Sequence, residues 1–240
     1  MSDVVATPLI EARKVTRILP GIVPTTLVRD IDLVIRPHEF VAITGPSGSG
    51  KSSLLYLLGL LDMPTAGEVL VEGKVTTVMT EDERALARLT MLGFVFQFHF
   101  LLPELTVIDN VMLPMRALGR LSRDEMRERG AALLTSLGLG DHIDKRPDQL
   151  SGGQRQRVAV ARSLANEPPV ILADEPTGSL DSKSSAQVFE VLRELVHGQG
   201  KTVVAVTHDM AMAERMDRHV ELLDGRLVGD DLHHLENANA

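Results

Sequence analysis

The chain has 240 residues, of which 44% are hydrophobic and 24% charged, a balance that excludes wholesale disorder and suits a globular protein. It contains no cysteine, which excludes a disulfide framework, a thiolate zinc site and a cysteine nucleophile. A net charge of −8, one tyrosine and no tryptophan argue against binding of nucleic acid through backbone phosphates or base stacking.

Neither a secretory signal nor a membrane span is expected. Residues 1–7 lack the basic region and long apolar run of a signal peptide. The most apolar stretch, residues 54–61, is far shorter than the roughly 20 residues that a membrane helix needs. We therefore expect a cytosolic chain that can still dock on a membrane protein.

Four short apolar runs predict buried strands, and each run ends in polar groups. The runs cover residues 40–44, 94–96, 170–173 and 203–207, followed by a glycine-rich loop, Gln97, Asp174 with Glu175, and His208. Helical patterns alternate with them over residues 52–61, 154–165 and 184–197. This alternation predicts a parallel α/β sheet covered on both faces. Because ligands bind beyond the carboxyl ends of parallel strands, the four endings could form one site; unrelated surface loops are the alternative.

The glycine-rich loop fits the P-loop pattern. Its glycines let the backbone N–H groups turn toward phosphate oxygens, its lysine supplies charge to the β- and γ-phosphates, and its last hydroxyl can bind Mg²⁺. The helix that follows adds the positive end of its dipole. The pattern predicts a phosphate site at Gly45, Pro46, Ser47, Gly48, Ser49, Gly50, Lys51 and Ser52.

Two carboxylates and a histidine follow the later strands. Asp174 can bind Mg²⁺ through water, and Glu175 can orient or deprotonate an attacking water. His208 ends the fourth strand and is a candidate catalytic group at the same edge. A pair of solvated acids and a hydrogen-bonded histidine are the structural alternatives.

A second glycine pair lies in the segment Leu150-Ser151-Gly152-Gly153-Gln154, directly before a helical run. Ser151 can cap that helix, and the glycines leave backbone N–H groups open. The segment is either a further phosphate site or an ordinary serine-glycine helix cap, and its spacing from the P-loop does not decide between them.

Together, these residues resemble those of the ABC-transporter ATPases, over roughly residues 9–228. The P-loop, Gln97, the segment 150–154, the segment 170–175, Ser179-Leu180-Asp181 and His208 occur in the family's order. The resemblance implies an α/β fold: a P-loop NTPase (RecA-like) core, an N-terminal antiparallel β subdomain and a helical signature subdomain. It also implies ATP and Mg²⁺ as cofactors, and hydrolysis of ATP to ADP and phosphate.

The resemblance further implies roles within one nucleotide site. Residues 49–53, Ser53 included, would bind phosphates, and Ser52, Gln97 and Asp174 would hold Mg²⁺. Glu175 would be the general base, and His208 would sense the γ-phosphate.

Other roles implied by the resemblance belong to a dimer. Ser151, Gly152, Gly153 and Gln154 would meet the ATP held by a second ATPase subunit. Asp181 would link the two sites across the interface. A homodimer is the favoured form, because every motif residue needed for two active sites is present in this chain.

A closer resemblance is to the MacB, LolD and YbbA group, carried by residues 58–68, 97–106 and 173–178. Members pair with integral membrane permease subunits and drive lipoprotein release, efflux or transmission of force to the periplasm. The resemblance thus implies a position on the inner face of the cell membrane, through the partner. It places the apolar segment 98–115 near the groove for the partner's coupling helix, although plain core packing would also explain these side chains.

The N-terminal region departs from the family pattern. An aromatic ring usually stacks on adenine there, whereas residues 15–20 contain none. Either Ile18 or Leu19 packs on the base or stacking is lost, and we expect weaker base discrimination. Tyr56, inside the P-loop helix, is a poor substitute.

The predicted organisation is a single ABC ATPase domain over residues 1–240. Its nucleotide-binding core comprises 1–97 and 164–228, its helical subdomain 98–163, and a polar tail 229–240, whose adjacent His233 and His234 have no spaced partners for a metal site. The alternative function is a soluble ABC-type ATPase in nucleic-acid handling or protein assembly, which the lack of sustained heptads between Gln97 and Leu150 disfavours. A P-loop kinase or small GTPase would not need the segment 150–154.

Overall fold

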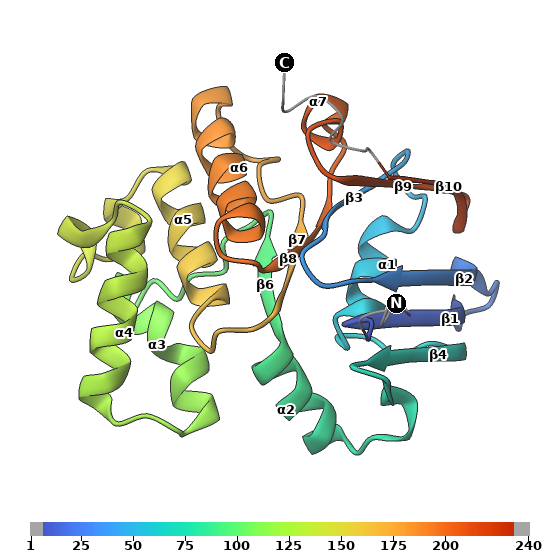
Figure 1. The fold of residues 1–240 in the computed structure, drawn as a ribbon, viewed down its shortest axis with the longest axis horizontal. Coiled ribbons are helices and arrows are strands. Elements are labelled where there is room, and N and C mark those ends of the chain that lie inside the picture. Colours follow the sequence, from blue (N-terminus) through green and yellow to red (C-terminus); the bar gives the residue numbers. More distant parts are fainter. Residues whose placement is uncertain (1–6, 233–240) are drawn as a thin grey trace, which may run out of the picture.

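Strands and helices alternate along the chain in the computed structural model, which describes residues 7–232 (Figure 1). The strands are β1 (Ile10–Leu19), β2 (Thr25–Ile35), β3 (Phe40–Thr44), β4 (Ala66–Val71), β5 (Lys74–Val75), β6 (Leu92–Phe96), β7 (Val170–Asp174), β8 (Thr202–Val206), β9 (Arg218–Leu223) and β10 (Arg226–Leu232). The helices are α1 (Lys51–Leu58), α2 (Glu81–Met91), α3 (Val107–Leu118), α4 (Arg123–Ser136), α5 (Gly152–Ser163), α6 (Ser182–His197) and α7 (Met210–Ala213).

A six-stranded sheet in the order β10-β9-β3-β8-β7-β6 forms the centre of the fold. Its strands are parallel except for β10, which is antiparallel to β9. Every residue of β3, β7 and β8 is buried, as their continuous apolar sequences predicted, because the sheet is covered on both faces. The predicted parallel α/β core is confirmed.

Alternate side chains of these strands enter two different cores. Val41 and Ile43 pack in one core with Leu54 of α1. Ala42, between them, belongs to the other core, with Phe189 of α6. Each fully buried leucine or phenylalanine contributes roughly 1.5–3 kcal/mol, so the apolar face of α1 fixes the helix that begins with the P-loop lysine.

The N-terminal part forms a separate four-stranded sheet in the order β2-β1-β4-β5. All its pairings are antiparallel. Its buried side chains, among them Ile10 and Val28, join the same core as α1. The predicted antiparallel β subdomain is therefore present and packs against the P-loop helix.

Helices α3, α4 and α5 share a third core, which lies in the segment 98–163 except for Ala165. Buried Asn110 of α3 holds the preceding loop: its Oδ1 accepts from the N–H of Leu102 at 2.7 Å, and its Nδ2 donates to the carbonyl of Thr106 at 2.9 Å. The chain after β6 is thereby tied to the helical region. The domain boundaries themselves stay a prediction.

The predicted tail, residues 229–240, begins too early. Residues 229–232 are the end of β10, where Asp230 pairs with Val220 and Asp231 with His219 of β9. Their polar composition indicated a tail, but an edge strand commonly carries charged side chains. Residues 233–240, with His233 and His234, lie outside the described residues.

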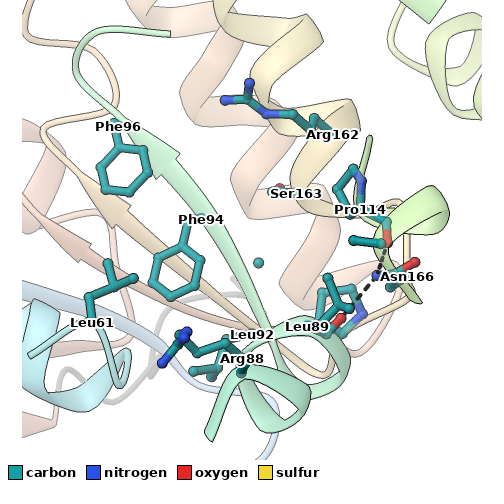
Figure 2. Close-up of a pocket in the computed structure, with 14 residues that line it drawn as sticks. Leu61, Arg88, Leu89, Leu92, Phe94, Phe96, Pro114, Arg162, Ser163 and Asn166 are labelled. Carbon is teal, nitrogen blue, oxygen red and sulfur yellow. Dashed lines mark hydrogen bonds between the residues drawn. The ribbon is translucent and has the colours of Figure 1, made fainter. Parts of the chain in front are cut away.

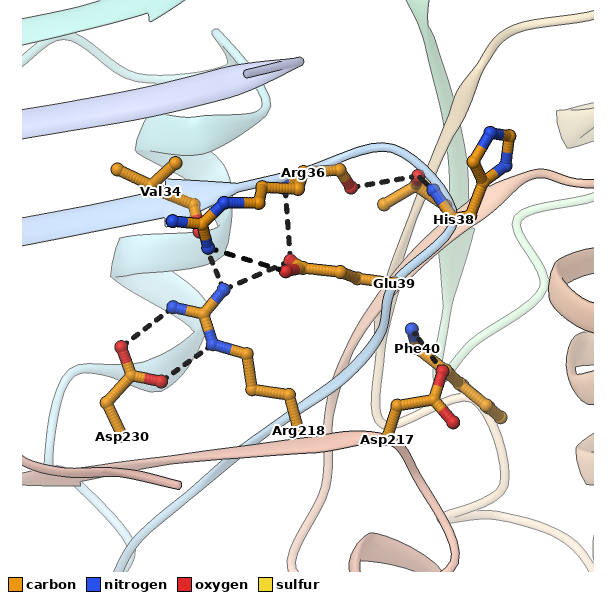
Figure 3. Close-up of polar contacts among 9 residues, drawn as sticks. Val34, Arg36, His38, Glu39, Phe40, Asp217, Arg218 and Asp230 are labelled. Atoms are coloured by element: carbon orange, nitrogen blue, oxygen red, sulfur yellow. Dashed lines mark hydrogen bonds and ion pairs between the residues drawn. The ribbon is translucent and has the colours of Figure 1, made fainter. Parts of the chain in front are cut away.

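A buried guanidinium ties β9 and β10 to the connection between β2 and β3 (Figure 3). The Arg218 side chain is 5% exposed and makes two bonds of 2.7 Å to Asp230. It also donates to the carbonyl of Val34 at 2.7 Å and to Glu39 at 3.0 Å. The hydrogen bonds to Asp230 outweigh burial and raise the pKa of Arg218 above its usual value. Arg218 therefore stays charged and fixes the C-terminal hairpin.

We expect Arg218→Met to lower the free energy of unfolding by about 3 kcal/mol, because Glu39 and Asp230 lose their shared cation. Urea denaturation measures this loss. Arg226→Met is the matched control, since its 3.4 Å pair with Asp30 is exposed on both sides; its effect should stay under about 1 kcal/mol. Equal losses in the two variants would contradict the structural role of Arg218.

Candidate active site

The four predicted strand endings lie at one edge of the six-stranded sheet. Strands β3, β8, β7 and β6 are neighbours in that order and all parallel. The P-loop, His208, the Asp174-Glu175 pair and Gln97 therefore follow adjacent strands. The structure brings these groups together, although they are spread over more than half of the sequence.

Glycines shape the loop between β3 and α1. Gly50 has a φ of 99°, and a Cβ at this position would lie 2.2 Å from the carbonyl oxygen of Leu27. No residue with a side chain fits there. Gly48 also has a positive φ, 80°, but a Cβ there would meet nothing within 4 Å, so the tip of the loop faces open space.

The start of α1 has unused hydrogen-bonding groups. The helix has no side-chain cap and no acidic residue in its first turn, so its first N–H groups keep their positive potential. Ser49 Oγ is buried without a partner. Lys51 Nζ donates to the carbonyl oxygens of Gly45 and Pro46, at 2.8 and 2.9 Å. A cation, open N–H groups and an unpaired buried hydroxyl together fit bound phosphate groups.

Two hydroxyl groups of α1 hold the carboxylate of Asp174, the last residue of β7. Ser52 Oγ donates to Oδ1 and Tyr56 Oη donates to Oδ2, each at 2.9 Å. Ser52 and Tyr56 are four residues apart and so share one face of the helix. Burial, together with the hydrogen bond to Asp174, raises the pKa of Tyr56 to about 12.

From the sequence, Tyr56 is considered only as a poor substitute for the missing adenine-stacking ring. In the structure it instead contacts Asp174 and Phe96. Its ring lies edge-on to Phe96 of β6, with centroids 6.4 Å apart. The spacing from Ser52 could have placed both hydroxyls on one helix face. Nothing in that spacing indicates a partner on β7.

The titration of Tyr56 can be measured directly, because it is the only tyrosine. We expect its phenolate absorbance to appear with a midpoint of about 12 in the folded protein, against about 10 in the unfolded chain. The raised pKa stabilises the fold below pH 10, and this contribution is lost as the pH rises through about 12. Asp174→Asn should lower the midpoint and Tyr56→Phe should abolish the signal. An ordinary midpoint in the folded wild type would contradict the hydrogen bond.

Glu175 and His208 lie side by side. Glu175 has a φ of 48°, and its N–H donates to the carbonyl of Val206 in β8 at 3.0 Å, so the sheet holds this strained backbone. Its Oε2 lies 2.8 Å from His208 Nδ1 and accepts from the His208 N–H at 3.4 Å. The Glu175 side chain is 17% exposed and that of His208 69%, so the histidine lies at the mouth of the site.

Gln97 follows β6 at the same level of the sheet. Phe96, directly before it, pairs with Asp174. The carbonyl of Gln97 accepts from Ser179 Oγ at 3.1 Å, and its Nε2 lies 3.1 Å from the position of a Cβ on Gly178. The turn after Glu175 therefore packs on Gln97, which joins the ends of β6 and β7.

The segment 150–154 is a capped helix start. Ser151 Oγ accepts from the Gln154 N–H at 3.2 Å, and Gln154 Oε1 accepts from the Ser151 N–H at 2.8 Å. Gln154 Nε2 also lies 2.8 Å from His142 Nε2. The cap that the sequence allowed is thus present, while phosphate binding by Gly152 and Gly153 stays a prediction.

The signature segment, residues 150–154, and the P-loop lie on opposite sides of the sheet (Figure 1). Side chains of α1 belong to one core and Val160 of α5 to the core on the other face. Within one subunit, the signature is therefore not part of the phosphate site at α1.

Asp181 lies close to the signature. It caps α6 by accepting from the N–H and the Oγ of Ser184, at 3.0 and 2.7 Å, and these bonds lower its pKa. Ser184 Oγ is 2.7 Å from the position of a Cβ on Gly153. Gly153 thus allows α5 to approach α6 beside Asp181.

Ile18 and Leu19 end β1. The Ile18 N–H donates to Thr65 Oγ1 at 3.0 Å, and Leu19 is 40% exposed. No Phe, Tyr or Trp occurs in residues 1–39. Contact of either side chain with a base stays a prediction.

The candidate metal ligands are a hydroxyl, an amide and a carboxylate, from Ser52, Gln97 and Asp174. Such oxygen donors suit Mg²⁺, which usually takes one or two carboxylates and completes its shell with substrate phosphates and water. Within residues 7–232, no group of three or more His, Asp or Glu side chains is placed to hold a metal ion. With one carboxylate among them, Ser52, Gln97 and Asp174 fit a metal whose shell is completed by substrate phosphates and water.

Comparison with known proteins identifies the family. A family model described as ABC transporter matches residues 28–178. The chain belongs to the ABC transporter family. The matched span includes the P-loop, Gln97, the signature, Asp174 and Glu175 of this ABC ATPase.

Its relatives include transporter ATPases. The "Lipoprotein-releasing system ATP-binding protein LolD" of Anaeromyxobacter dehalogenans is 48% identical over 99% of this chain and 100% of its own length. LolD of Aquifex aeolicus is 46% identical over 92% of this chain and 97% of its length. The "Macrolide export ATP-binding/permease protein MacB" of Agrobacterium fabrum is 47% identical over 93% of this chain but 34% of its own length.

Solved structures confirm the fold. The ATP-binding cassette MJ0796, in a dimeric post-hydrolysis state bound to ADP and Pi, has a TM-score of 0.86 and 41% identity, covering 93% of this chain and 98% of that one. The predicted P-loop NTPase fold and the resemblance to the MacB and LolD group are confirmed. The protein is an ABC-type ATPase of transporters.

Proposed function

We propose that this ATPase drives a separate membrane subunit in lipoprotein release, with efflux or force transmission to the periplasm as the second candidate. The observation that carries the chemistry is the end of β7, where Asp174 bonds to α1 and Glu175 to His208. The match to LolD relatives over their full length supports lipoprotein release, whereas MacB is matched over a third of its length.

The P-loop would hold the phosphates of ATP. Lys51 would exchange the carbonyls of Gly45 and Pro46 for phosphate oxygens, and Ser49, Ser53 and the open N–H groups of α1 would complete the cradle. Ser52, Gln97 and Asp174 would hold Mg²⁺, which when bound neutralises charge on the phosphates. Ile18 and Leu19 would meet the base.

Glu175 would orient the attacking water and take up its proton. The carboxylate is held at the sheet edge by its own backbone bond to β8 and by His208, so little reorganisation is needed. His208, exposed at the mouth, would contact the γ-phosphate while its Nδ1 stays on the Glu175 carboxylate. Their 2.8 Å contact couples phosphate sensing to the general base.

We expect Glu175→Gln to reduce the ATPase rate by about 100-fold or more, because the amide accepts no proton. ATP binding should persist, and the blocked protein should accumulate as a dimer with ATP. Steady-state hydrolysis and light scattering measure the two effects. Glu167→Gln is the control, because the Glu167 carboxylate pairs with Arg129 away from the site. This variant should hydrolyse ATP at the normal rate and stay monomeric. A monomeric Glu175→Gln protein at saturating ATP would argue against dimer closure.

The dimer would complete each nucleotide site. Ser151, Gly152, Gly153 and Gln154 lie across the sheet from the chain's own P-loop, so they would bind the ATP of a second subunit. Asp181, which caps α6 beside Gly153, would carry the link between the two sites. A homodimer would then contain two complete sites.

A groove between α2, β6, α3 and α5 is the proposed docking site for the membrane subunit (Figure 2). It has a volume of about 490 Å³ and is lined mainly by apolar side chains, with Asn166 holding α2 to α3 through the carbonyls of Leu89 and Pro114. The exposed rings of Phe98 and Phe100 continue this apolar surface from Phe96. Its surface fits a short amphipathic helix.

The charge at the groove indicates which helix would bind. Arg162 is half-buried, and its guanidinium donates only to the carbonyls of His99 and Phe100 among the described residues. Burial lowers the pKa of Arg162. A carboxylate placed next to the guanidinium would raise this pKa again. We therefore propose that the permease helix carries an acidic residue that pairs with Arg162.

Leu61→Asp should abolish co-purification with the permease from detergent-solubilised membranes, lowering recovery about tenfold or more, because a charge enters the apolar contact. Leu61 lines the groove and is 46% exposed, so folding should tolerate the change. Val78→Asp, at an apolar position outside the groove that is 82% exposed, is the matched control. Equal recovery of the permease with both variants would rule out this docking site.

The position of the protein would follow from its partner. No helix within residues 7–232 is long and apolar enough to cross a membrane. The permease would hold the ATPase at the inner face of the cell membrane. Recovery of nucleic acid instead of a membrane protein would support the alternative soluble ATPase, which the transporter relatives do not favour.

A further inference from the structure

We propose that Tyr56 is a positioning residue for the Mg²⁺ site, acting through the carboxylate of Asp174. The proposal rests on the function proposed above, since it presupposes Mg²⁺ at Ser52, Gln97 and Asp174. It adds a residue that lies outside the P-loop, signature and strand-end motifs.

The two oxygens of Asp174 have different partners. Oδ1 bonds to Ser52, the hydroxyl proposed to bind the metal, so this oxygen faces the metal position. Oδ2 bonds to Tyr56, one helical turn further along α1. An aspartate side chain rotates easily about its last bond, because that torsion has broad and shallow minima. With both oxygens bonded, the carboxylate plane is fixed and Oδ1 stays directed at the site.

Tyr56 is itself held by the sheet. Its ring contacts Phe96, whose ring stacks on Phe94 with centroids 6.0 Å apart. Phe96 pairs with Asp174 in the sheet and directly precedes Gln97. The tyrosine therefore touches α1, β6 and β7, the three elements that carry or adjoin the candidate metal ligands.

The size of the effect follows from other metal sites. Hydrogen bonds to the ligands of a metal commonly change its affinity by about 10–100-fold. Asp174 is proposed to reach Mg²⁺ through water, so we expect the lower end, about tenfold.

The test is Tyr56→Phe, which keeps the ring against Phe96 and removes only the hydroxyl. The ligand is ADP, which is not hydrolysed and does not bring in the ATP-dependent dimer expected of Glu175→Gln. Calorimetry gives the Kd for ADP in excess Mg²⁺ and again in EDTA. The Kd in EDTA divided by the Kd in Mg²⁺ isolates the contribution of the metal. We expect Tyr56→Phe to weaken binding about tenfold with Mg²⁺ and less than about twofold in EDTA.

Thr90→Val is the matched control, because it removes a hydroxyl that bonds to the carbonyl of Leu86 on α2. It should leave both constants unchanged. Equal weakening with and without Mg²⁺ would overturn the proposal and show a general packing effect. No change in either constant would also overturn it. A larger ratio would overturn it too, because it would mean that the hydroxyl stabilises the metal-free site. Wild-type binding that does not respond to Mg²⁺ would contradict the proposed metal site as well.

Discussion

The rest of the site depends on the hydrogen-bonded carboxylate of Asp174. It joins the end of β7 to Ser52 and Tyr56 of α1, which are 122 and 118 residues away in the chain. The P-loop lies at one end of this link and Glu175 at the other. The bonds to Asp174 therefore set the distance between the groups that hold phosphate and the group proposed to activate water.

The phosphate site requires local arrangements that do not stabilise the isolated chain. α1 lacks a side-chain cap, which in other helices is worth about 1 kcal/mol. Gly50 adopts a conformation that no other residue fits, and Ser49 buries an unpaired hydroxyl. Burial of Leu54, Leu55, Leu57 and Leu58 offsets these costs, because each leucine contributes more than one cap. Bound phosphate would satisfy the groups left open.

The two faces of the sheet separate the P-loop from the signature segment. The P-loop helix covers one face, and the signature helix packs behind the other. The proposed groove for the permease lies between α2, β6, α3 and α5, and it is lined by Phe96, the residue before Gln97. The helical region therefore adjoins both the signature and the loop after Gln97, and Asn110 ties that loop to α3.

The sequence by itself determined the parallel sheet, its polar strand endings, the P-loop and the family, because these depend on short patterns such as continuous apolar runs and glycines next to Lys51. The tertiary structure alone decided the partner of Tyr56, the contact of Arg218 with Val34, Glu39 and Asp230, and the pairing of residues 229–232 with β9. Each joins residues separated in the chain, and side-chain type does not indicate which distant group it will meet. From the sequence alone, a tyrosine inside a helix is expected to be a core or a surface residue. Only the position of β7 shows that it bonds to a carboxylate. Likewise, the polar composition of residues 229–231 predicts a tail, whereas in the structure these residues pair with the edge of β9.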